Sequence, residues 1–333
     1  MKKKDSAKTS AKSGKGAKPA PEEAPRRGLG RTLFRGLYLG AAWLATGLFL
    51  LGLPMRLVGD DSDTLAILFY ATPWAVLMVC GALASWYWRV RWKFALGLLG
   101  ATLLCLGAWI WTAFRFPPEG RGKSDFRVAY WNCAHPDWTL RGILPMAASW
   151  NAEVMCFGES RSGALSPKWA EAFPNLRVQP LVRDMLLAGP ESVELKSSGS
   201  LNGGGDFELC RAKLGGREVF LIVVDFDATP GKSRRPAFDR LCQLVDAYST
   251  QPLIVMGDFN TPFDSVHFQR LRAKMTDTFD NAGSGLSATW PMLAPVLSLD
   301  HILVNKFLRV VRCEHHTSIY SDHRAVVAEL AWR

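Results

Sequence analysis

Leu253-Ile254-Val255-Met256-Gly257-Asp258-Phe259-Asn260 is a short apolar run that ends in a glycine and two polar residues. Its β-branched residues and its turn residues predict a buried strand that ends at this point. Because alternate residues of an extended segment project to the same side, we expect Asp258 and Asn260 to face one spot. A carboxylate beside a carboxamide suits a hard cation and a positioned water, although the same residue types also form ordinary turns.

Other predicted strands also end or begin in polar residues. One apolar run leads into Asn132 and another into Glu159. Near the C-terminus, Asp300-His301 begins a predicted strand and Ser321-Asp322-His323 precedes the last one. A histidine whose imidazole is held by an acid keeps a fixed orientation and can contact a phosphoryl oxygen. Because polar residues recur at the ends of several predicted strands, we expect them to form one shared site.

Helical and strand patterns alternate irregularly after residue 125. Helical spacing occurs at residues 140–150, 235–248 and 264–274, between the predicted strands. This alternation indicates a layered α/β domain rather than a barrel of repeated units. Asn202-Gly203-Gly204-Gly205 lacks the lysine of a phosphate-binding loop and predicts a hairpin turn.

The formal net charge of +10 is concentrated at the N-terminus. Residues 1–35 carry eleven Lys or Arg and three Asp or Glu, whereas the chain after residue 114 is nearly neutral. Bulk charge therefore gives no support for a nucleic-acid groove in the large C-terminal region.

The domain boundaries follow from composition. Residues 1–31 are rich in Lys, Ala, Ser and Gly, which predicts a disordered basic cytoplasmic tail. Residues 32–115 are predicted to form a transmembrane region of three helices. Residues 116–124 have the Pro, Gly and charged composition of a linker, and the folded domain is expected over residues 125–333.

The three predicted spans are Leu33 to Leu53, Leu65 to Trp88 and Phe94 to Phe114. Each is long enough to cross the hydrocarbon of a bilayer, and aromatic residues gather near the span ends. Helices of a soluble bundle would show a polar face, which these stretches lack.

Loop charges predict the orientation. The tail and the second loop are basic, while the first loop carries three Asp residues and one Arg. An excess of Lys and Arg marks the cytoplasmic side, so an odd number of spans sends the C-terminal domain across the membrane. A basic cluster after the third span, from Arg115 to Arg127, argues mildly for the opposite sense.

The seven cysteines are irregularly spaced and match neither a disulfide framework nor a zinc pattern. We interpret them mostly as small core residues. The sequence leaves open whether Cys133 and Cys156 form a bridge.

Taken in order, the polar strand ends resemble the endonuclease/exonuclease/phosphatase (DNase I-like) superfamily, over about residues 125–333. The motifs that carry the resemblance are Asn132, Glu159, Gly257-Asp258-Phe259-Asn260, Asp300-His301 and Ser321-Asp322-His323. Thr289-Trp290-Pro291 and the preceding apolar spans look like its membrane-anchored bacterial branch. The resemblance implies a four-layer α/β sandwich with the site at one edge of two facing sheets.

The resemblance also implies a metal site. Glu159 would be the principal ligand of Mg2+, or of Mn2+ as the alternative, with Asn132 beside it. Asp322 would help to bind the metal. Oxygen ligands of this kind are those that Mg2+ prefers.

The remaining motif residues take catalytic roles by the same resemblance. Asp258 would hold or activate the attacking water, and Asn260 would orient it. His323 would contact the scissile phosphoryl group, and Asp300 would orient His323. This assignment agrees with in-line attack of an oriented water on a phosphate ester.

Two positions depart from the family pattern. Many members have a histidine after the strand that corresponds to Val219–Val224, where this chain has Asp225-Phe226-Asp227. Asp225 either alters substrate preference or turnover, or recruits another cation. Gly158 stands where glutamine is common before the acid.

The expected function is a membrane-anchored, Mg2+-dependent hydrolase of phosphodiesters or phosphomonoesters. Its substrate would be nucleic acid, a phospholipid headgroup or a small ester, and its other partner the lipid bilayer. We infer no obligate protein partner. The expected location is the bacterial inner membrane, with the N-terminus cytoplasmic and the catalytic domain outside. The alternative is a catalytically silent, membrane-tethered binding domain of the same fold.

Overall fold

The computed structural model describes residues 29–116, 122–136, 139–161 and 167–333. By compactness the chain divides into two units, residues 1–41 and residues 42–333. Most of the predicted tail and five residues of the predicted linker lie outside the described residues.

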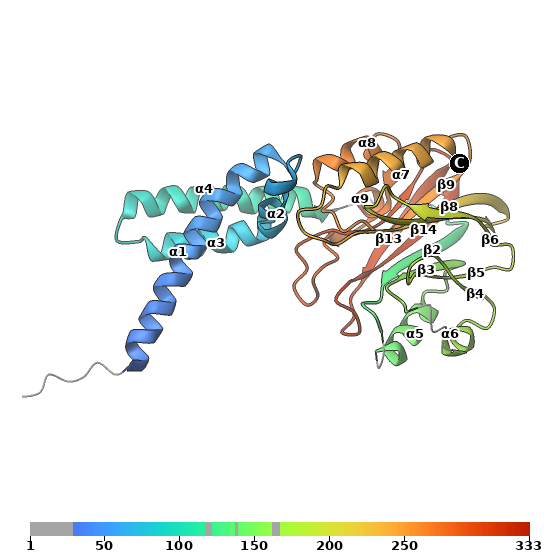
Figure 1. Cartoon of the computed structure of the whole chain (residues 1–333), viewed down its shortest axis with the longest axis horizontal. Helices are drawn as coiled ribbons and strands as arrows, with labels where there is room; N and C mark the ends of the chain where they lie inside the picture. Colours follow the sequence, from blue (N-terminus) through green and yellow to red (C-terminus); the bar gives the residue numbers. More distant parts are fainter. Residues whose placement is uncertain (1–28, 117–121, 137–138, 162–166) are drawn as a thin grey trace, which may run out of the picture. The chain divides into compact units, whose positions relative to one another are not determined.

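Two six-stranded sheets form the core of an α/β domain that extends from β2 to β14 (Figure 1). The first sheet has the strand order β13-β14-β2-β3-β5-β4 and the second has the order β10-β12-β9-β8-β7-β6. The first sheet contains β2 (Phe126–Asn132), β3 (Val154–Gly158), β4 (Arg177–Pro180), β5 (Leu186–Gly189), β13 (Leu308–His316) and β14 (Ala325–Trp332). The second contains β6 (Glu194–Ser200), β7 (Gly205–Leu214), β8 (Arg217–Phe226), β9 (Leu253–Asp258), β10 (Thr276–Asp277) and β12 (Asp300–Val304). β1 (Phe114–Arg115) pairs separately with β11 (Gly285–Leu286).

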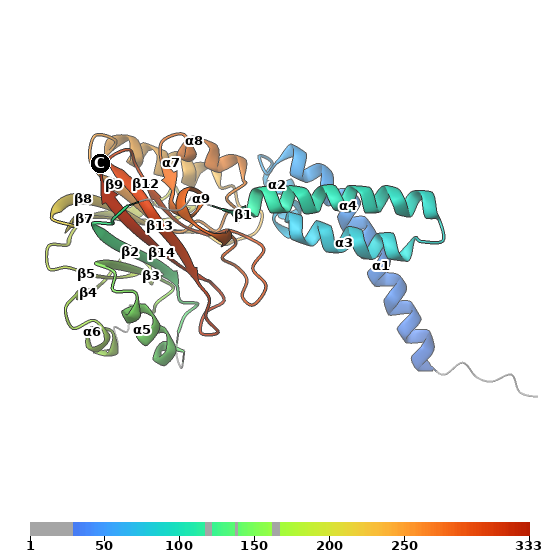
Figure 2. The ribbon, with the colours of Figure 1, turned by 180° about the vertical axis from the view of Figure 1, so that it is seen from behind.

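Helices cover the outer faces of both sheets (Figures 1 and 2). These helices are α5 (Leu140–Ser149), α6 (Pro167–Ala172), α7 (Arg235–Ala247), η2 (Val266–Phe268) and α8 (Gln269–Arg272), whereas α9 (Thr278–Ala282) packs Phe279 and Ala282 into the core between the sheets. The helix predicted over residues 264–274 is thus shorter and begins with a 3-10 turn. The helix-sheet-sheet-helix order matches the predicted four-layer α/β sandwich.

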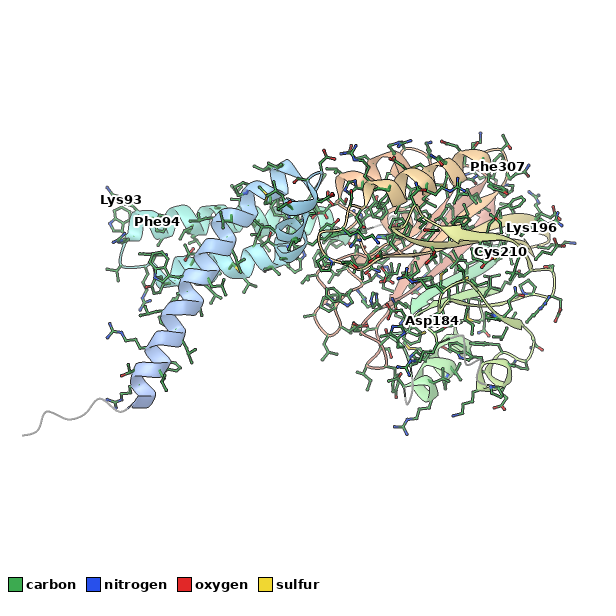
Figure 3. All side chains as sticks on the ribbon, viewed as in Figure 1. Lys93, Phe94, Asp184, Lys196, Cys210 and Phe307 are labelled. Atoms are coloured by element: carbon green, nitrogen blue, oxygen red, sulfur yellow. The ribbon has the colours of Figure 1, made fainter. Side chains whose placement is uncertain are left out.

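Alternation along the central strands explains these layers. On β9, Ile254 and Met256 face the other sheet, while Leu253 and Val255 pack under α7. β2 divides its residues in the same way between the inter-sheet core and the layer under α5. Side chains fill the space between the sheets, with Cys210 inside and Lys196 on the outer rim (Figure 3). Strands buried on both faces read as continuous apolar runs, which is why the sequence located them.

Cys133 and Cys156 do not form a disulfide, since both are free and buried. Their strands are neighbours, but Cys156 packs in the inter-sheet core and Cys133 packs on the opposite face of the sheet, in the layer that contains α5.

The apolar N-terminal region differs from three single spans. α1 (Leu29–Val58) and α4 (Trp92–Ala113) are each long and apolar enough to cross a membrane. The predicted middle span is instead two short helices, α2 (Asp63–Ala71) and α3 (Trp74–Tyr87), bent by 67° at a short break. Pro73 lies at that break, where it has no N–H to continue the α2 hydrogen-bond ladder and precedes the first turn of α3.

The connection between α1 and α2 is packed against the α/β domain through Asp60, which is fully buried. Its carboxylate accepts hydrogen bonds from the Ser265 hydroxyl at 2.6 Å, the Val266 N–H at 3.0 Å and the Tyr70 hydroxyl at 3.0 Å. This carboxylate therefore holds the start of η2, a few residues after Asp258.

We expect Asp60→Asn to lower the free energy of unfolding by about 1.5–3 kcal/mol, since hydrogen bonds to a buried charge are lost. Asp61→Asn is the matched control, because Asp61 is exposed and pairs with the exposed Arg235. Thermal unfolding of the full chain in detergent measures both. Equal melting temperatures for the two variants would contradict the proposed role of Asp60.

Candidate active site

Four aspartates lie side by side across the second sheet. Asp206 of β7 pairs with Asp225 of β8, Asp225 with Asp258 of β9, and Asp258 with Asp300 of β12. Residues directly opposite each other on neighbouring strands point to the same face. The register therefore places a row of carboxylates at one edge of the sandwich.

Burial of this row raises the pKa of its central acids. Burial and the adjacent Asp300 carboxylate raise the pKa of Asp258 to about 8. Burial likewise raises the pKa of Asp225 to about 6, although the Arg183 guanidinium acts to lower it. Carboxylates that are costly to ionise together attract a cation, which would favour their charged forms.

The first sheet contributes Asn132 and Glu159 to the same edge. Asn132 is the last residue of β2 and lies opposite Gly158, so Glu159 follows directly beside it. The Asn132 Nδ2 donates to Asp258 Oδ2 at 2.9 Å and to Glu159 Oε1 at 3.2 Å. The two predicted acids of opposite sheets therefore converge on one amide.

Asn132 is oriented differently from a metal ligand. Its Oδ1 accepts the Ala134 N–H at 2.9 Å, while its nitrogen faces Glu159 and Asp258. An amide N–H cannot bind a cation, so in this arrangement Asn132 holds the two acids together.

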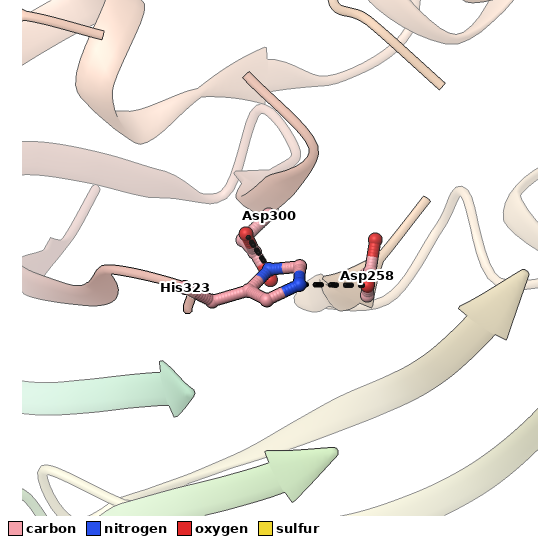
Figure 4. Close-up of side chains that lie close together, drawn as sticks. All are labelled: Asp258, Asp300 and His323. Carbon is pink, nitrogen blue, oxygen red and sulfur yellow. Dashed lines mark hydrogen bonds and ion pairs between the residues drawn. The ribbon is translucent and has the colours of Figure 1, made fainter. Parts of the chain in front are cut away.

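His323 lies between the acids of the second sheet (Figure 4). Its Nδ1 is 2.8 Å from Asp300 Oδ2, and its Nε2 is 4.0 Å from Asp258 Oδ2. Burial acts to lower the pKa of His323, but Asp300, Asp258 and Asp322 raise it to about 10. These acids therefore favour the charged imidazolium, and Nε2 is directed toward Asp258.

The remaining predicted residues lie around this centre. The Asn260 N–H donates to Asp258 Oδ1 at 2.8 Å, and its Nδ2 donates to the Phe226 carbonyl at 2.9 Å. Asp322 is half exposed at the rim, with Oδ1 3.9 Å from His323 Nε2. All seven predicted site residues thus belong to one edge of the sandwich.

His301 is turned away from this edge, although it follows Asp300. Its Nδ1 is 2.9 Å from Asp277 Oδ2 and its Nε2 is 3.1 Å from the Ser298 carbonyl. Successive residues of a strand point to opposite faces, which separates the two neighbours.

Three further residues of the site were not predicted from the sequence. His135 Nε2 lies 3.4 Å from Glu159 Oε2, and Arg183 Nε lies 3.6 Å from Asp225 Oδ2. The Tyr130 hydroxyl is buried below the acids and has no hydrogen-bond partner among the described residues. A Cβ on Gly158 would meet that hydroxyl at 2.3 Å, which explains why a larger residue does not fit there. None of the three belongs to the motifs that the sequence identified.

Comparison with known proteins agrees with this geometry. Residues 129–323 match the Endonuclease/Exonuclease/phosphatase family. The chain belongs to this family. Its members are metal-dependent phosphoester hydrolases, and the chain is an enzyme of this class. No curated protein matches the chain at a significant level.

Solved structures share the fold. A mannosyl-6-phosphatase from Bacteroides thetaiotaomicron is 16% identical, covers 62% of this chain and 100% of its own chain, and has a TM-score of 0.52. A 3′ phosphatase from Neisseria bound to a product DNA hairpin is 17% identical, with coverages of 62% and 100% and a TM-score of 0.50. A protein of unknown function from Enterococcus faecalis is 15% identical, with the same coverages and a TM-score of 0.51. At such identities the likeness shows the fold alone.

The residues present fit the divalent cation that the family uses. The convergent ligand atoms are oxygens of Glu159 and Asp258, which suit a hard cation. Asp300 Oδ1 is also buried and has no partner among the described residues. Oxygen ligands, raised carboxyl pKa values and an unsatisfied buried oxygen are what a cation would complement.

Proposed function

We propose that this family member is a membrane-anchored, Mg2+-dependent phosphoesterase that cleaves phosphodiesters or phosphomonoesters. The convergence of Asn132, Glu159, Asp258, Asp300 and His323 from two sheets is the observation that supports it most. The carboxylate oxygens of Glu159 and Asp258 suit Mg2+, and they suit Mn2+ as the alternative.

Each residue then has a distinct task. Glu159 and Asp258 would hold Mg2+, with help from Asp322 at the rim, and Asn132 keeps the two acids in place. When bound, the cation supplies positive charge that offsets the charge on the phosphoryl oxygens.

The other residues handle water and phosphate. Asp258 accepts a proton from the attacking water, which Asn260 orients. His323 donates a hydrogen bond from Nε2 to a phosphoryl oxygen, and Asp300 fixes its ring through Nδ1.

Three crossings explain the helical region best. Asp60 before α2 and Ala113 at the end of α4 both contact the α/β domain, through Ser265 and Ser287. If α4 crosses the bilayer once, its start lies on the side opposite the α/β domain, which supports a further crossing by the bent α2–α3 pair. Three crossings and the basic N-terminal segment support our proposal of a cytoplasmic N-terminus and an α/β domain outside the bacterial inner membrane.

The function is tested with the full chain in detergent, using p-nitrophenyl phosphate and bis(p-nitrophenyl) phosphate. We expect hydrolysis that EDTA abolishes and Mg2+ restores. Glu159→Gln should raise the Mg2+ concentration required for half-maximal activity by about 10–100-fold, by analogy with lost metal-site contacts.

Two outcomes would contradict this function. Hydrolysis that persists in EDTA would exclude the metal-dependent mechanism. Inactivity on both esters in every metal would favour the silent binding domain, for which Asp225 in place of the family histidine is the supporting feature.

A further inference from the structure

Large apolar side chains are rare on the surface of the α/β domain. Among the described residues after residue 121, those exposed are Leu195, Leu293 and Ile319, and the last two are 78% and 76% exposed. Leu293 and Ile319 line the same cavity of about 410 Å³, together with Met292 and Tyr320. Exposed apolar groups that gather at a cavity mark a binding surface.

This cavity adjoins the active site at two points. It is lined by His135, which lies 3.4 Å from Glu159, and by Asp322, which lies 3.9 Å from His323. A substrate whose phosphate contacts His323 would therefore have room for its remaining part in this cavity.

The loop that carries Leu293 starts and ends beside α4. It follows β11, which pairs with β1 directly after α4, and the Ser287 N–H donates to the Ala113 carbonyl at 2.7 Å. Its returning residues Val296 and Leu297 line a second cavity together with Trp109 and Trp111 of α4. Tryptophans near the end of a spanning helix lie at the level of the lipid headgroups. The loop thus connects the membrane surface to the active site.

Charge at the cavity disfavours a nucleic acid. Among the described residues that line it there is no Lys or Arg, and Asp322 is acidic. A nucleic-acid strand needs several cations along its backbone. An ester with one phosphate and an apolar tail requires only the active site for its phosphate and the apolar side chains of the cavity for its tail.

We propose, building on the function above, that the substrate is a lipid phosphate ester drawn from the bilayer, whose apolar part contacts Leu293, Ile319 and Met292. Water adds to phosphorus, the bond from phosphorus to the lipid alcohol oxygen breaks, and the proton from water passes to that leaving oxygen. The products are a lipid alcohol and a phosphate, or a phosphomonoester if the substrate is a diester.

The test compares lipids with matched soluble esters, using the full chain in mixed micelles with Mg2+. Phosphatidic acid is paired with glycerol phosphate, and phosphatidylglycerol with glycerophosphoglycerol. In one of these pairs, we expect kcat/KM for the lipid to exceed kcat/KM for its matched soluble ester. In the variant with Leu293→Gln and Ile319→Gln this preference should fall by about 10–100-fold, because the exposed apolar side chains that would cover the lipid tail are lost.

Leu195→Gln is the control, since Leu195 is an exposed apolar residue on β6, at the far edge of the second sheet. It should leave the lipid preference unchanged. Two results would overturn this proposal alone. One is hydrolysis of the soluble esters with no preference for the lipids, and the other is a lipid preference that the double variant retains. Faster cleavage of a DNA oligonucleotide than of either lipid would also overturn it. Inactivity on every ester would overturn the proposed function and the lipid substrate together.

Discussion

Asp258→Asn is expected to reduce kcat/KM by about 10²–10⁴-fold, the usual contribution of a positioned general base. Asp258 is 1% exposed and lies where Asn132, Asn260 and His323 meet. Asparagine keeps its shape but removes the charge that holds a cation and accepts a proton. Steady-state kinetics on p-nitrophenyl phosphate with saturating Mg2+ measures the loss.

Stability distinguishes this loss from misfolding. Burial and Asp300 disfavour the charged form of Asp258 and raise its pKa, so removal of the charge should offset the one hydrogen bond that the amide cannot accept and leave the melting temperature in EDTA little changed. Asp246→Asn, an exposed change on α7, should leave kinetics and melting unchanged. Activity of Asp258→Asn within a few-fold of the unaltered enzyme would reject its catalytic role.

Asp300→Asn is expected to lower kcat/KM at neutral pH by about 10²-fold or more, because His323 loses the acid that orients and charges it. In the folded protein the neighbouring acids outweigh burial and raise the pKa of His323 to about 10. A histidine is charged below its pKa, so the variant should lose the imidazolium at a lower pH. The alkaline limb of the pH profile should move down by about one unit or more.

Proton NMR of the imidazole and the pH dependence of kcat/KM measure this shift. Asp277→Asn is the matched control, because it removes a buried acid from His301, which faces away from the site. It should lower stability and leave the pH profile unchanged. The pH dependence of stability follows from the same shift. The stabilisation that charged His323 gives the folded protein is complete below the pKa of an unfolded histidine and is lost as the pH rises through about 10. An unchanged alkaline limb in Asp300→Asn would show that His323 does not need this partner.

Much of the site could be predicted because strand ends in such a fold meet at one edge. Asn132, Glu159, Asp258 and Asp300 each follow or begin an apolar run, and local pattern is enough to identify those runs. The neighbours that modify them were not predictable. Arg183 lies on a turn between short strands and reaches Asp225 only through tertiary packing. The amide of Asn132 has two orientations, and only its surroundings select one.

In the helical region, too, part of the structure could be predicted from the sequence and part could not. Apolar length predicted helices, but the 67° bend between α2 and α3 depends on how Pro73 is accommodated, and periodicity does not report this. The strand β13 was not predicted, although it pairs with β14 along its length. Its burial pattern mixes buried and half-buried residues, so it lacks a strong apolar run.

The sequence by itself determined the family, the layered α/β class and the chemical types of the site residues, because each is encoded in a short run whose pattern survives without its surroundings. Tertiary structure alone decided which atoms face one another: the row of carboxylates from Asp206 to Asp300, the bridge made by Asn132, and the apolar cavity at Leu293 and Ile319. These depend on strand register and on loops packed from distant parts of the chain, and pairing energies over such distances are not written in any local stretch.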